Sequence, residues 1–350
     1  MTVPVAIAAS FDLPSPPVAT RPFHGGHINK AWLVTTASGG LHLLQRLNTE
    51  VFKDPAAVMA NALAVTMHLK RRNVRTLRFR PTLEGEFIHE EPSGTFWRVC
   101  DFIPDTVGLT VPRTAADCRA AGLAFGQFAS HLATYPAAEL LDTIPGFHAT
   151  GLRLAALFAA QFMDSSDRLA ECREEVSRLR DLGWLARALP VDELPARVAH
   201  NDAKLANVLL DKNTSQPICV VDLDTVMPGT LLHDFGDLIR SLVSPEPEDS
   251  TRLDRVMVQE RYFENLVAGY LEGAGNLLTD LERSNLVTAG LVITYEQAIR
   301  FLADHLAGDV YYKVSRPGHN LDRARNQLRL LEQLLGCVAR LEDMVSAASS

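Results

Sequence analysis

Two short stretches of the sequence carry side chains suited to phosphoryl transfer. Residues 200–211 read HNDAKLANVLLD, and residues 220–229 read VVDLDTVMPG. Phosphoryl transfer needs a carboxylate that orients the attacking hydroxyl and accepts its proton, together with oxygen ligands that hold Mg²⁺ on the phosphates. Asp202 can supply the carboxylate, and Asn207 with Asp222 can supply the ligands. The order of these residues therefore predicts a magnesium- and ATP-dependent phosphotransferase.

The same region holds further polar residues that could support the reaction. Lys204 follows Asp202 by two residues and is placed to neutralise charge on the transferred phosphoryl group. His200 and Asp224 complete the pattern HxDxKxxN followed by DxD. Any one of these residues could belong to an ordinary turn, because Asp is common there, but five matched positions in order are harder to explain in that way. The isolated DxD, read as the metal site of a nucleotide-sugar glycosyltransferase, is the weaker interpretation.

The elements around these residues must bring them to one cleft. Short apolar strands are expected over residues 197–199, 208–210 and 218–222. A hairpin turn at residues 211–216 would place Asn207 and Asp222 side by side, each near a strand end.

Upstream of residue 103, the sequence predicts a small β-rich lobe. Two apolar runs within residues 31–47 flank the turn Ser38-Gly39-Gly40, which favours a hairpin because glycine tolerates positive φ. Asp54 and Pro55 then begin a helix as its N-cap and first helical residue. Two further strands are expected over residues 77–82 and 95–102.

Residues 103–108, IPDTVG, break the periodicity and mark the expected lobe boundary. Helices are expected after it, over residues 115–132, from a capping box at Thr279 to a stop at Gly308, and over residues 320–347. We therefore predict an α+β fold with two lobes. Residues 1–103 would form the nucleotide-binding lobe, and residues 104–350 the larger, mainly helical lobe for catalysis and substrate binding.

A glycine-rich loop precedes the first strand of the N-terminal hairpin. Residues 24–29 read HGGHIN, and Gly25, Gly26 and His27 are candidates for closing over the ATP phosphates through backbone N–H groups. Two glycines beside a strand are also consistent with a plain turn. The downstream catalytic pattern is what favours the nucleotide-binding interpretation.

Composition excludes several classes of partner. The formal net charge of -8 argues against nucleic-acid binding, which depends on clustered Lys and Arg. Lys70-Arg71-Arg72 fits the basic last turn of a helix. The five cysteines are scattered without metal-ligand spacing, which suggests neither disulfides nor zinc and fits a reducing cytoplasm. No uninterrupted apolar run reaches the length of about 20 residues that spans a bilayer, so no membrane partner is expected.

With its continuation TLLHDFGDLIR, the catalytic pattern resembles the aminoglycoside phosphotransferase and choline kinase superfamily, which has a protein-kinase-like fold. A narrower resemblance, to the N-acetylhexosamine 1-kinases, is spread from about Gly25 to Leu335. It is carried by the segments LLQRLNTEVFKDPAAVM, FWRVCDFI, DLDTVMPG and ITYEQAIRFLADHLAGDVYYKVSRPGHNLDRARNQ. The narrower resemblance implies transfer of the ATP γ-phosphate to the anomeric hydroxyl of N-acetylglucosamine or N-acetylgalactosamine.

The resemblance also implies residue roles. Asp202 would be the base at the acceptor hydroxyl, and Asn207 and Asp222 would be the magnesium ligands. Arg300 and Tyr311 would contact the sugar. Taken without the resemblance, Arg300 fits a solvated helix arginine and Tyr311 a packed aromatic residue at a helix exit.

The resemblance also implies which residues brace the catalytic loop and which residue binds the ATP phosphates. Asp234 and Asp237 would brace the catalytic loop rather than touch substrate. The superfamily's strand lysine, which pairs with the α- and β-phosphates, is expected in LHLLQRL, where this chain has Gln45 and Arg46. Arg46 is the candidate replacement, but strand alternation points these two side chains to opposite faces.

Two alternative functions remain open. The first is a kinase for another small hydroxyl compound, such as an amino alcohol, choline, methylthioribose or an aminoglycoside. Cationic acceptors would favour an acidic or aromatic pocket, whereas neutral sugars need hydrogen-bonding groups such as Arg300 and Tyr311. The second is a non-catalytic pseudokinase, against which the intact Asp202, Asn207 and Asp222 argue.

Overall fold

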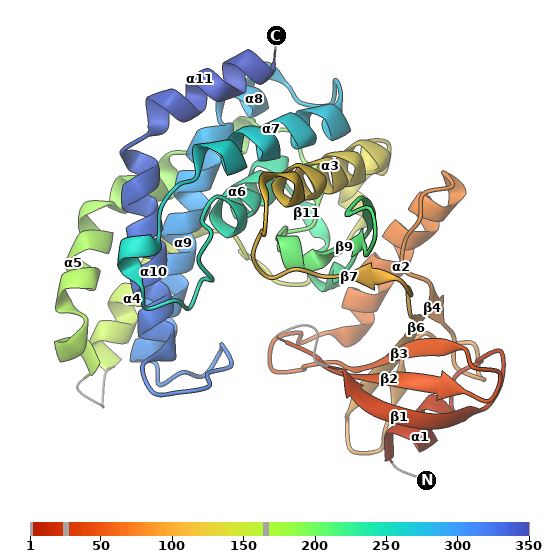
Figure 1. Ribbon diagram of the computed structural model, residues 1–350. Coiled ribbons are helices and arrows are strands. Elements are labelled where there is room, and N and C mark those ends of the chain that lie inside the picture. The colour runs from red at the N-terminus through yellow and green to blue at the C-terminus, as the bar shows by residue number, and fades with distance from the viewer. Residues whose placement is uncertain (1–2, 24–27, 164–167, 350) are drawn as a thin grey trace.

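The computed structural model describes residues 3–23, 28–163 and 168–349. Figure 1 shows an antiparallel sheet with two helices at one end of the molecule and a larger helical part that carries the C-terminus. This arrangement confirms the predicted α+β class, with a small β-rich N-terminal part and a larger helical C-terminal part.

The N-terminal sheet has the strand order β1-β2-β3-β6-β4, with β5 also paired to β6. Its strands are β1 (Pro17–Phe23), β2 (Lys30–Thr36), β3 (Leu41–Arg46), β4 (Phe79–Arg80), β5 (His89–Glu90) and β6 (Phe96–Asp101). The predicted hairpin is formed by β2 and β3, and Gly39 in its turn has φ +82°. The strand predicted over residues 77–82 is shorter than expected, because only two of its residues pair with β6.

A helix covers each face of this sheet. On one face, α1 (Val3–Ala8) contributes Ile7 to a small core with Val34, Leu44 and Trp97. On the other face lies α2 (Pro55–Arg71), which begins as predicted, since the Asp54 carboxylate accepts a hydrogen bond from the Ala57 N–H (2.9 Å).

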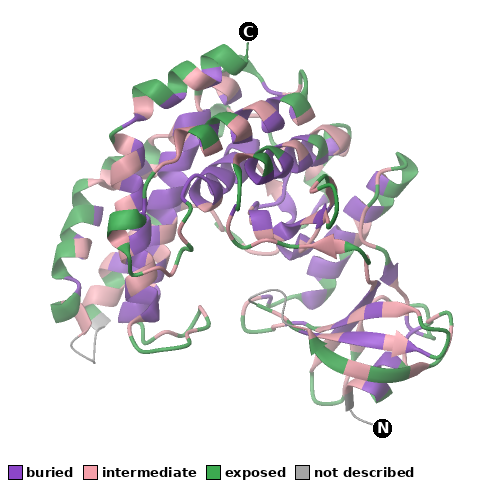
Figure 2. Ribbon diagram, in the orientation of Figure 1, coloured by how far each residue is buried: buried purple, intermediate pink, exposed green. Residues whose placement is uncertain are grey.

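The C-terminal part is built mainly from helices. They are α3 (Ala115–Leu132), α4 (Thr150–Met163), α5 (Arg173–Asp181), α6 (Leu231–Leu242), α7 (Glu260–Ala274), α8 (Asp280–Ser284), α9 (Leu286–Leu306), α10 (His319–Leu335) and α11 (Val338–Ala348). Figure 2 shows α6 and α9 mostly in the buried colour. Glycines let α3 and α7 approach closely, because a Cβ at Gly126 would overlap the Tyr270 carbonyl and a Cβ at Gly269 the Arg119 carbonyl.

Two small antiparallel sheets connect the helices to the candidate site. One has the order β10-β9-β7 and contains β7 (Thr106–Val107), β9 (Val208–Asp211) and β10 (Pro217–Val220). The other pairs β8 (Arg197–Ala199) with β11 (Met227–Gly229). The predicted hairpin between residues 208 and 222 is therefore present, and the segment expected at the lobe boundary supplies β7, which pairs with β9.

Two of the predicted long helices are each divided. The Thr279 capping box starts the short helix α8, and α9 begins separately after Asn285. The predicted last helix is α10 followed by α11, with a break at Gly336 and Cys337. Apolar periodicity continues through both breaks, so the pattern alone did not reveal them.

Helix α9 is the one helix within the described residues whose length and composition would let it cross a membrane. However, 78% of its most apolar 18-residue window is buried inside the protein. Its position is that of a core helix, packed against α6 and α10 (Figure 1).

Candidate active site

Residues 200–207, which we call the catalytic loop, follow β8 and are held by the first turn of α6. The Asp234 carboxylate accepts hydrogen bonds from the backbone N–H groups of His200 (2.8 Å) and Asn201 (2.7 Å). Asn201 has a left-handed backbone with φ +62° and donates through its side chain to the Thr225 carbonyl (3.0 Å). Asp234 therefore fixes the backbone immediately before Asp202, in line with the bracing role that the family resemblance implied.

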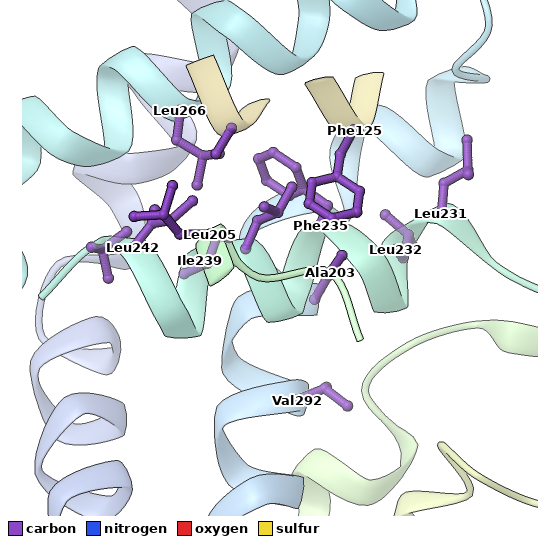
Figure 3. Close-up of a cluster of buried hydrophobic side chains, with 14 of the residues drawn as sticks. Phe125, Ala203, Leu205, Leu231, Leu232, Phe235, Ile239, Leu242, Leu266 and Val292 are labelled. Atoms are coloured by element: carbon purple, nitrogen blue, oxygen red, sulfur yellow. The ribbon is translucent and has the colours of Figure 1, made fainter. Parts of the chain in front are cut away.

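Apolar side chains of the loop anchor it in the core. Ala203 and Leu205 are 0% and 1% exposed, and Figure 3 shows them close to α6 residues such as Phe235. The side chains of Asp202 and Lys204 alternate with them and stay 23% and 25% exposed. The loop thus presents its two charged side chains while its apolar ones hold it in place.

Asp202 is surrounded by groups that favour its charged form. Lys204 Nζ lies 2.8 Å from its Oδ2, and Asn207 Nδ2 donates to the same oxygen (2.9 Å) and to the Asp202 carbonyl (2.8 Å). Burial alone would raise the pKa of Asp202, but the charge and hydrogen bond of Lys204 hold the pKa well below its usual range. Asp202 is therefore an oriented, ionised carboxylate at neutral pH.

His200 joins this loop to the segment that precedes Asp222. Its ring lies edge-on to Phe125, at 5.3 Å between ring centroids, and the residue is fully buried. Nε2 donates to the Val221 carbonyl (3.0 Å), while Nδ1 accepts from the Asp202 N–H (3.3 Å). His200 therefore has a structural place between the two motifs.

Asp222 lies beside Asn207, at the end of the β9–β10 hairpin, because the Val221 N–H donates to the Asn207 carbonyl (2.9 Å). It is not the last residue of a strand, as predicted, but a left-handed residue with φ +60°. Burial, and then the charges of Asp224 and Asp202, raise the pKa of Asp222 to about 6. A bound cation would relieve this crowding of negative charge.

The residues present fit a nucleotide-bound Mg²⁺. Among the described residues there is no cluster of three His, Cys, Asp or Glu side chains that could hold a metal alone. Mg²⁺ on a nucleotide typically takes only one or two protein ligands and completes its shell with phosphate oxygens and water. The Asp222 carboxylate, with the Asn207 Oδ1 that remains after Nδ2 bonds Asp202, matches that requirement.

Asp224 belongs to residues 222–226, which we call the metal loop, and it connects this loop to the N-terminal sheet. Its Oδ1 lies 2.6 Å from Arg98 Nη1, and its Oδ2 accepts from Asn29 Nδ2 (2.6 Å). Both charged side chains are 3% exposed. Gln45 extends this group, since its Oε1 accepts from Arg98 Nε (2.9 Å). No sequence pattern identified Arg98.

Of the residues predicted to bind ATP, the structure describes Arg46 only. Gly25, Gly26 and His27 lie outside the described residues. Arg46 is exposed at the end of β3, and strand alternation places it on the Leu44 face of the sheet, which α1 covers. Gln45 is the residue that points toward Asp224, so this geometry does not support the ATP role predicted for Arg46.

Arg300 lies among three aromatic rings in a group formed by Phe147, Arg300, Tyr311 and Tyr312, which we call the acceptor wall after the role predicted for Arg300 and Tyr311. The Arg300 guanidinium carbon lies 4.7 Å from the Phe147 ring centroid and 5.9 Å from each tyrosine ring. Burial lowers the pKa of Arg300, but Tyr312, Glu296 and Tyr311, and to a smaller extent Asp202, raise it.

Asp304, which the sequence did not single out, holds the backbone of residues 310–312, which we call the tyrosine loop. Its Oδ1 accepts from the N–H groups of Val310 (3.0 Å) and Tyr311 (2.7 Å), and its Oδ2 accepts from that of Tyr312 (2.9 Å). The segment ADHLAGDVYY holds both the carboxylate and the loop, so their closeness in sequence was a signal for this contact.

His148 and Glu296 link the acceptor wall to the catalytic loop. His148 Nδ1 lies 2.9 Å from Glu296 Oε1, and its Nε2 lies 3.1 Å from the Asn201 carbonyl. Thr150 donates to the other Glu296 oxygen (2.6 Å), and Arg300 Nη1 lies 3.9 Å from the first. The two ring nitrogens of His148 thus bridge Glu296 and the backbone of the catalytic loop. These residues lie far apart in sequence, which is why motif analysis missed them.

Asp237 does not contact the catalytic loop through a hydrogen bond. Its Oδ1 pairs with Arg240 Nε (2.6 Å) one turn later on α6, and Arg240 Nη1 pairs with Glu248 (2.9 Å). Burial raises the pKa of Asp237. Its support of the loop is at most indirect.

Comparisons with known proteins agree with this geometry. Residues 19–286 match the model of the phosphotransferase enzyme family. A microcompartment-associated aminopropanol kinase superposes with TM-score 0.63 at 17% identity, covering 97% of each chain. An aminoglycoside phosphotransferase from Alicyclobacillus acidocaldarius gives TM-score 0.64 at 12% identity, over 99% of this chain and 97% of that one. An amicoumacin kinase in complex with AMP-PNP and Ca²⁺ gives TM-score 0.61 at 13% identity, over 93% of this chain and 92% of that one.

The family match spans most of the chain, and the fold is that of small-molecule kinases. The chain therefore belongs to the phosphotransferase enzyme family. It is an ATP-dependent phosphotransferase that acts on a hydroxyl group of a small molecule.

Proposed function

We propose that this phosphotransferase is an N-acetylhexosamine 1-kinase, which transfers the γ-phosphate of ATP to the anomeric hydroxyl of N-acetylglucosamine or N-acetylgalactosamine. Residues 1–103 would bind the nucleotide, and residues 104–350 would supply the catalytic loop and the sugar site. All five cysteines are buried, which suits a reducing cytoplasm as the place of the reaction.

Asp202 is the residue that acts on the acceptor hydroxyl. Its ionised carboxylate orients the hydroxyl, whose oxygen forms a bond to the γ-phosphorus while the bond from that phosphorus to the β-bridging oxygen breaks. The hydroxyl proton passes to Asp202, and ADP leaves with the bridging oxygen. Because the pKa of Asp202 is low, this proton moves late, and positioning is the larger part of its contribution.

Charge on the transferred group is balanced by two kinds of residue. Asn207 and Asp222 would hold a Mg²⁺, which supplies neutralisation and alignment of the β- and γ-phosphates. Lys204, 25% exposed and paired with Asp202, can follow the γ-phosphoryl group as its charge spreads over the equatorial oxygens.

The placement of Arg300 carries the choice of acceptor. The Arg300 side chain is only 12% exposed, and its positive charge disfavours cationic acceptors such as choline, amino alcohols and aminoglycosides. It donates to neutral hydroxyl and amide oxygens, and the rings of Phe147 and Tyr311 beside it suit the apolar faces of a sugar. The nearby carboxylate of Glu296 is 1% exposed and engaged by His148 and Thr150, so it is not presented to a cation.

An ATP-consumption screen of the purified chain tests this proposal. Its acceptors are N-acetylglucosamine, N-acetylgalactosamine, glucose, choline, 1-amino-2-propanol and kanamycin, with phosphorus NMR of each product. We expect turnover with the N-acetylated sugars and an anomeric phosphate. Turnover confined to the amines would replace the proposal with the amino-alcohol or aminoglycoside alternative. ATP binding without turnover on any acceptor would favour the pseudokinase alternative.

A further inference from the structure

The N-terminal part lacks both members of a familiar ion pair. In protein kinases, a lysine on the third strand contacts the ATP phosphates and pairs with a glutamate on the following helix. Here the corresponding strand, β3, has Gln45 at the position facing the C-terminal part. The following helix, α2, contains no Asp or Glu in PAAVMANALAVTMHLKR. Lysine and glutamate are therefore missing together.

Instead of an acid, α2 uses an amide to reach the metal loop. Asn61, 2% exposed, donates through Nδ2 to the carbonyls of Val226 (2.9 Å) and Leu141 (2.8 Å) and accepts from the Leu141 N–H (2.9 Å). These bonds fix the helix against the loop but provide no charge to orient a strand cation.

An ion pair between Arg98 and Asp224 fills the same place from different elements. Arg98 is on β6, directly opposite Gln45 of β3, and Asp224 is two residues after the candidate metal ligand Asp222. The Phe79 ring lies 5.4 Å from the Arg98 guanidinium carbon. Burial lowers the pKa of Arg98, but the charges of Asp224 and, more weakly, Asp222 outweigh it and raise the pKa.

Other cations on these strands point elsewhere. Lys30 and Arg46 are register partners, so they share the face of the sheet that α1 covers. Arg80 pairs with Asp101 (2.7 Å). Among the described residues of β2, β3, β4 and β6, Arg98 is the cation that reaches the metal loop.

We propose that Arg98 and Asp224 together replace the lysine–glutamate pair of protein kinases, with the Arg98 guanidinium binding the α- and β-phosphates of ATP and Asp224 holding it in position. Guanidinium has five N–H donors in a planar fork, and the contacts to Gln45 and Asp224 leave donors for phosphate oxygens. The enclosed position strengthens a charge–phosphate contact. This inference uses ATP dependence and is independent of the acceptor.

Arg98→Met in the full chain tests the inference, with adenosine and AMP-PNP as calorimetric ligands in the presence of Mg²⁺. A phosphate-binding role predicts that AMP-PNP affinity falls about tenfold to a hundredfold, the range for losing a hydrogen bond to a charged group, while adenosine affinity changes less than twofold. Circular dichroism checks that the variant is folded. If Arg98→Met does not fold, Arg98→Lys and Asp224→Asn are compared in the same way, and the same selective loss for AMP-PNP is expected.

A rescue and two comparisons sharpen the result. Gln45→Lys combined with Arg98→Met returns a cation to the same face from β3, so AMP-PNP affinity should recover by at least about fivefold over Arg98→Met alone. Arg80→Met, which removes another paired strand arginine, should leave both affinities unchanged. Equal losses for adenosine and AMP-PNP, no loss for either, or a selective AMP-PNP loss in Arg46→Met instead would each overturn the proposal.

Discussion

The backbones of the catalytic loop and of the acceptor wall are held in the same way, but only the catalytic loop also has its functional side chain held by an ion pair. In each, a buried carboxylate on a helix collects backbone N–H groups: Asp234 takes two from the catalytic loop, and Asp304 takes three from the tyrosine loop. Beyond that point, Asp202 is also held through its side chain by Lys204.

The functional side chain of the acceptor wall is freer. Tyr311 is 44% exposed, and its ring contacts Tyr312 and Arg300 without a hydrogen bond to the rest of the described protein. Asp202 is thus held through both its backbone and its side chain, whereas Tyr311 is held by hydrogen bonds through its backbone alone. Mutations should therefore separate turnover from acceptor recognition.

The largest expected effect is at Asp202. Asp202→Asn should keep ATP binding but slow transfer by at least about a hundredfold with every acceptor, because the positioning carboxylate is lost. Steady-state rates together with a calorimetric Kd for AMP-PNP measure the two separately. Asp211→Asn, at the far end of the same hairpin, is the matched control and should turn over normally. Undiminished turnover of Asp202→Asn would remove this residue from its role.

Arg300→Ala should separate the acceptor wall from the catalytic loop. We expect kcat/KM for the sugar to fall about tenfold to a hundredfold, since a hydrogen bond from a charged donor is lost, while KM for ATP stays within about twofold. Arg178→Ala, which removes an exposed helix arginine on α5, is the matched control. An effect limited to the ATP KM would contradict the assignment of Arg300 to the acceptor.

Asp304→Asn should have a smaller effect of the same kind. Asparagine keeps one acceptor oxygen but loses the charge, so the three N–H groups of the tyrosine loop are satisfied less well. We expect kcat/KM for the sugar to fall about tenfold, mainly through KM, with melting temperature lowered by a few degrees. Equal losses in the sugar and ATP parameters would show that Asp304 supports the whole fold rather than this wall.

The sequence predicted the catalytic region better than the acceptor region, and the reason is local spacing. Asp202, Asn207 and Asp222 lie in short motifs whose strands and hairpin can be predicted from two apolar runs and the turn between them, and the structure brings these residues together. His148 and Glu296 meet across 148 positions of sequence, so only the packing of the folded helices joins them.

The same limit applies to the nucleotide side. Arg98 lies in FWRVCDFI, where a strand was predicted correctly but nothing in the sequence gave a reason to select this arginine. Its partner Asp224 was recognised as part of DxD, yet pairing them needs the register of β3 with β6 and the approach of the metal loop to the sheet. Contacts between elements that are distant in sequence therefore account for most of what was missed.

The last expected effect is on stability rather than on turnover and concerns His233, which lies on α6 next to Asp234 and has its ring 4.6 Å from that of His148. Burial, and then the His148 charge, lower the pKa of His233 to about 3, while the charge of Glu296 acts in the opposite direction. The unfolded chain, with a histidine pKa of about 6.5, binds more protons between pH 6.5 and 3. Stability should therefore fall as pH falls through this window.

From pH 7 to pH 5, this histidine should remove about 2 kcal/mol from the free energy of unfolding. Urea unfolding of the wild type and His233→Gln at both pH values measures the difference, since histidines that do not contact His233 contribute equally in the two proteins. The variant should lose about 2 kcal/mol less than the wild type over this range. Equal losses would mean that His233 accepts its proton in the folded state, and that the junction between the catalytic loop and the acceptor wall is looser than its burial implies.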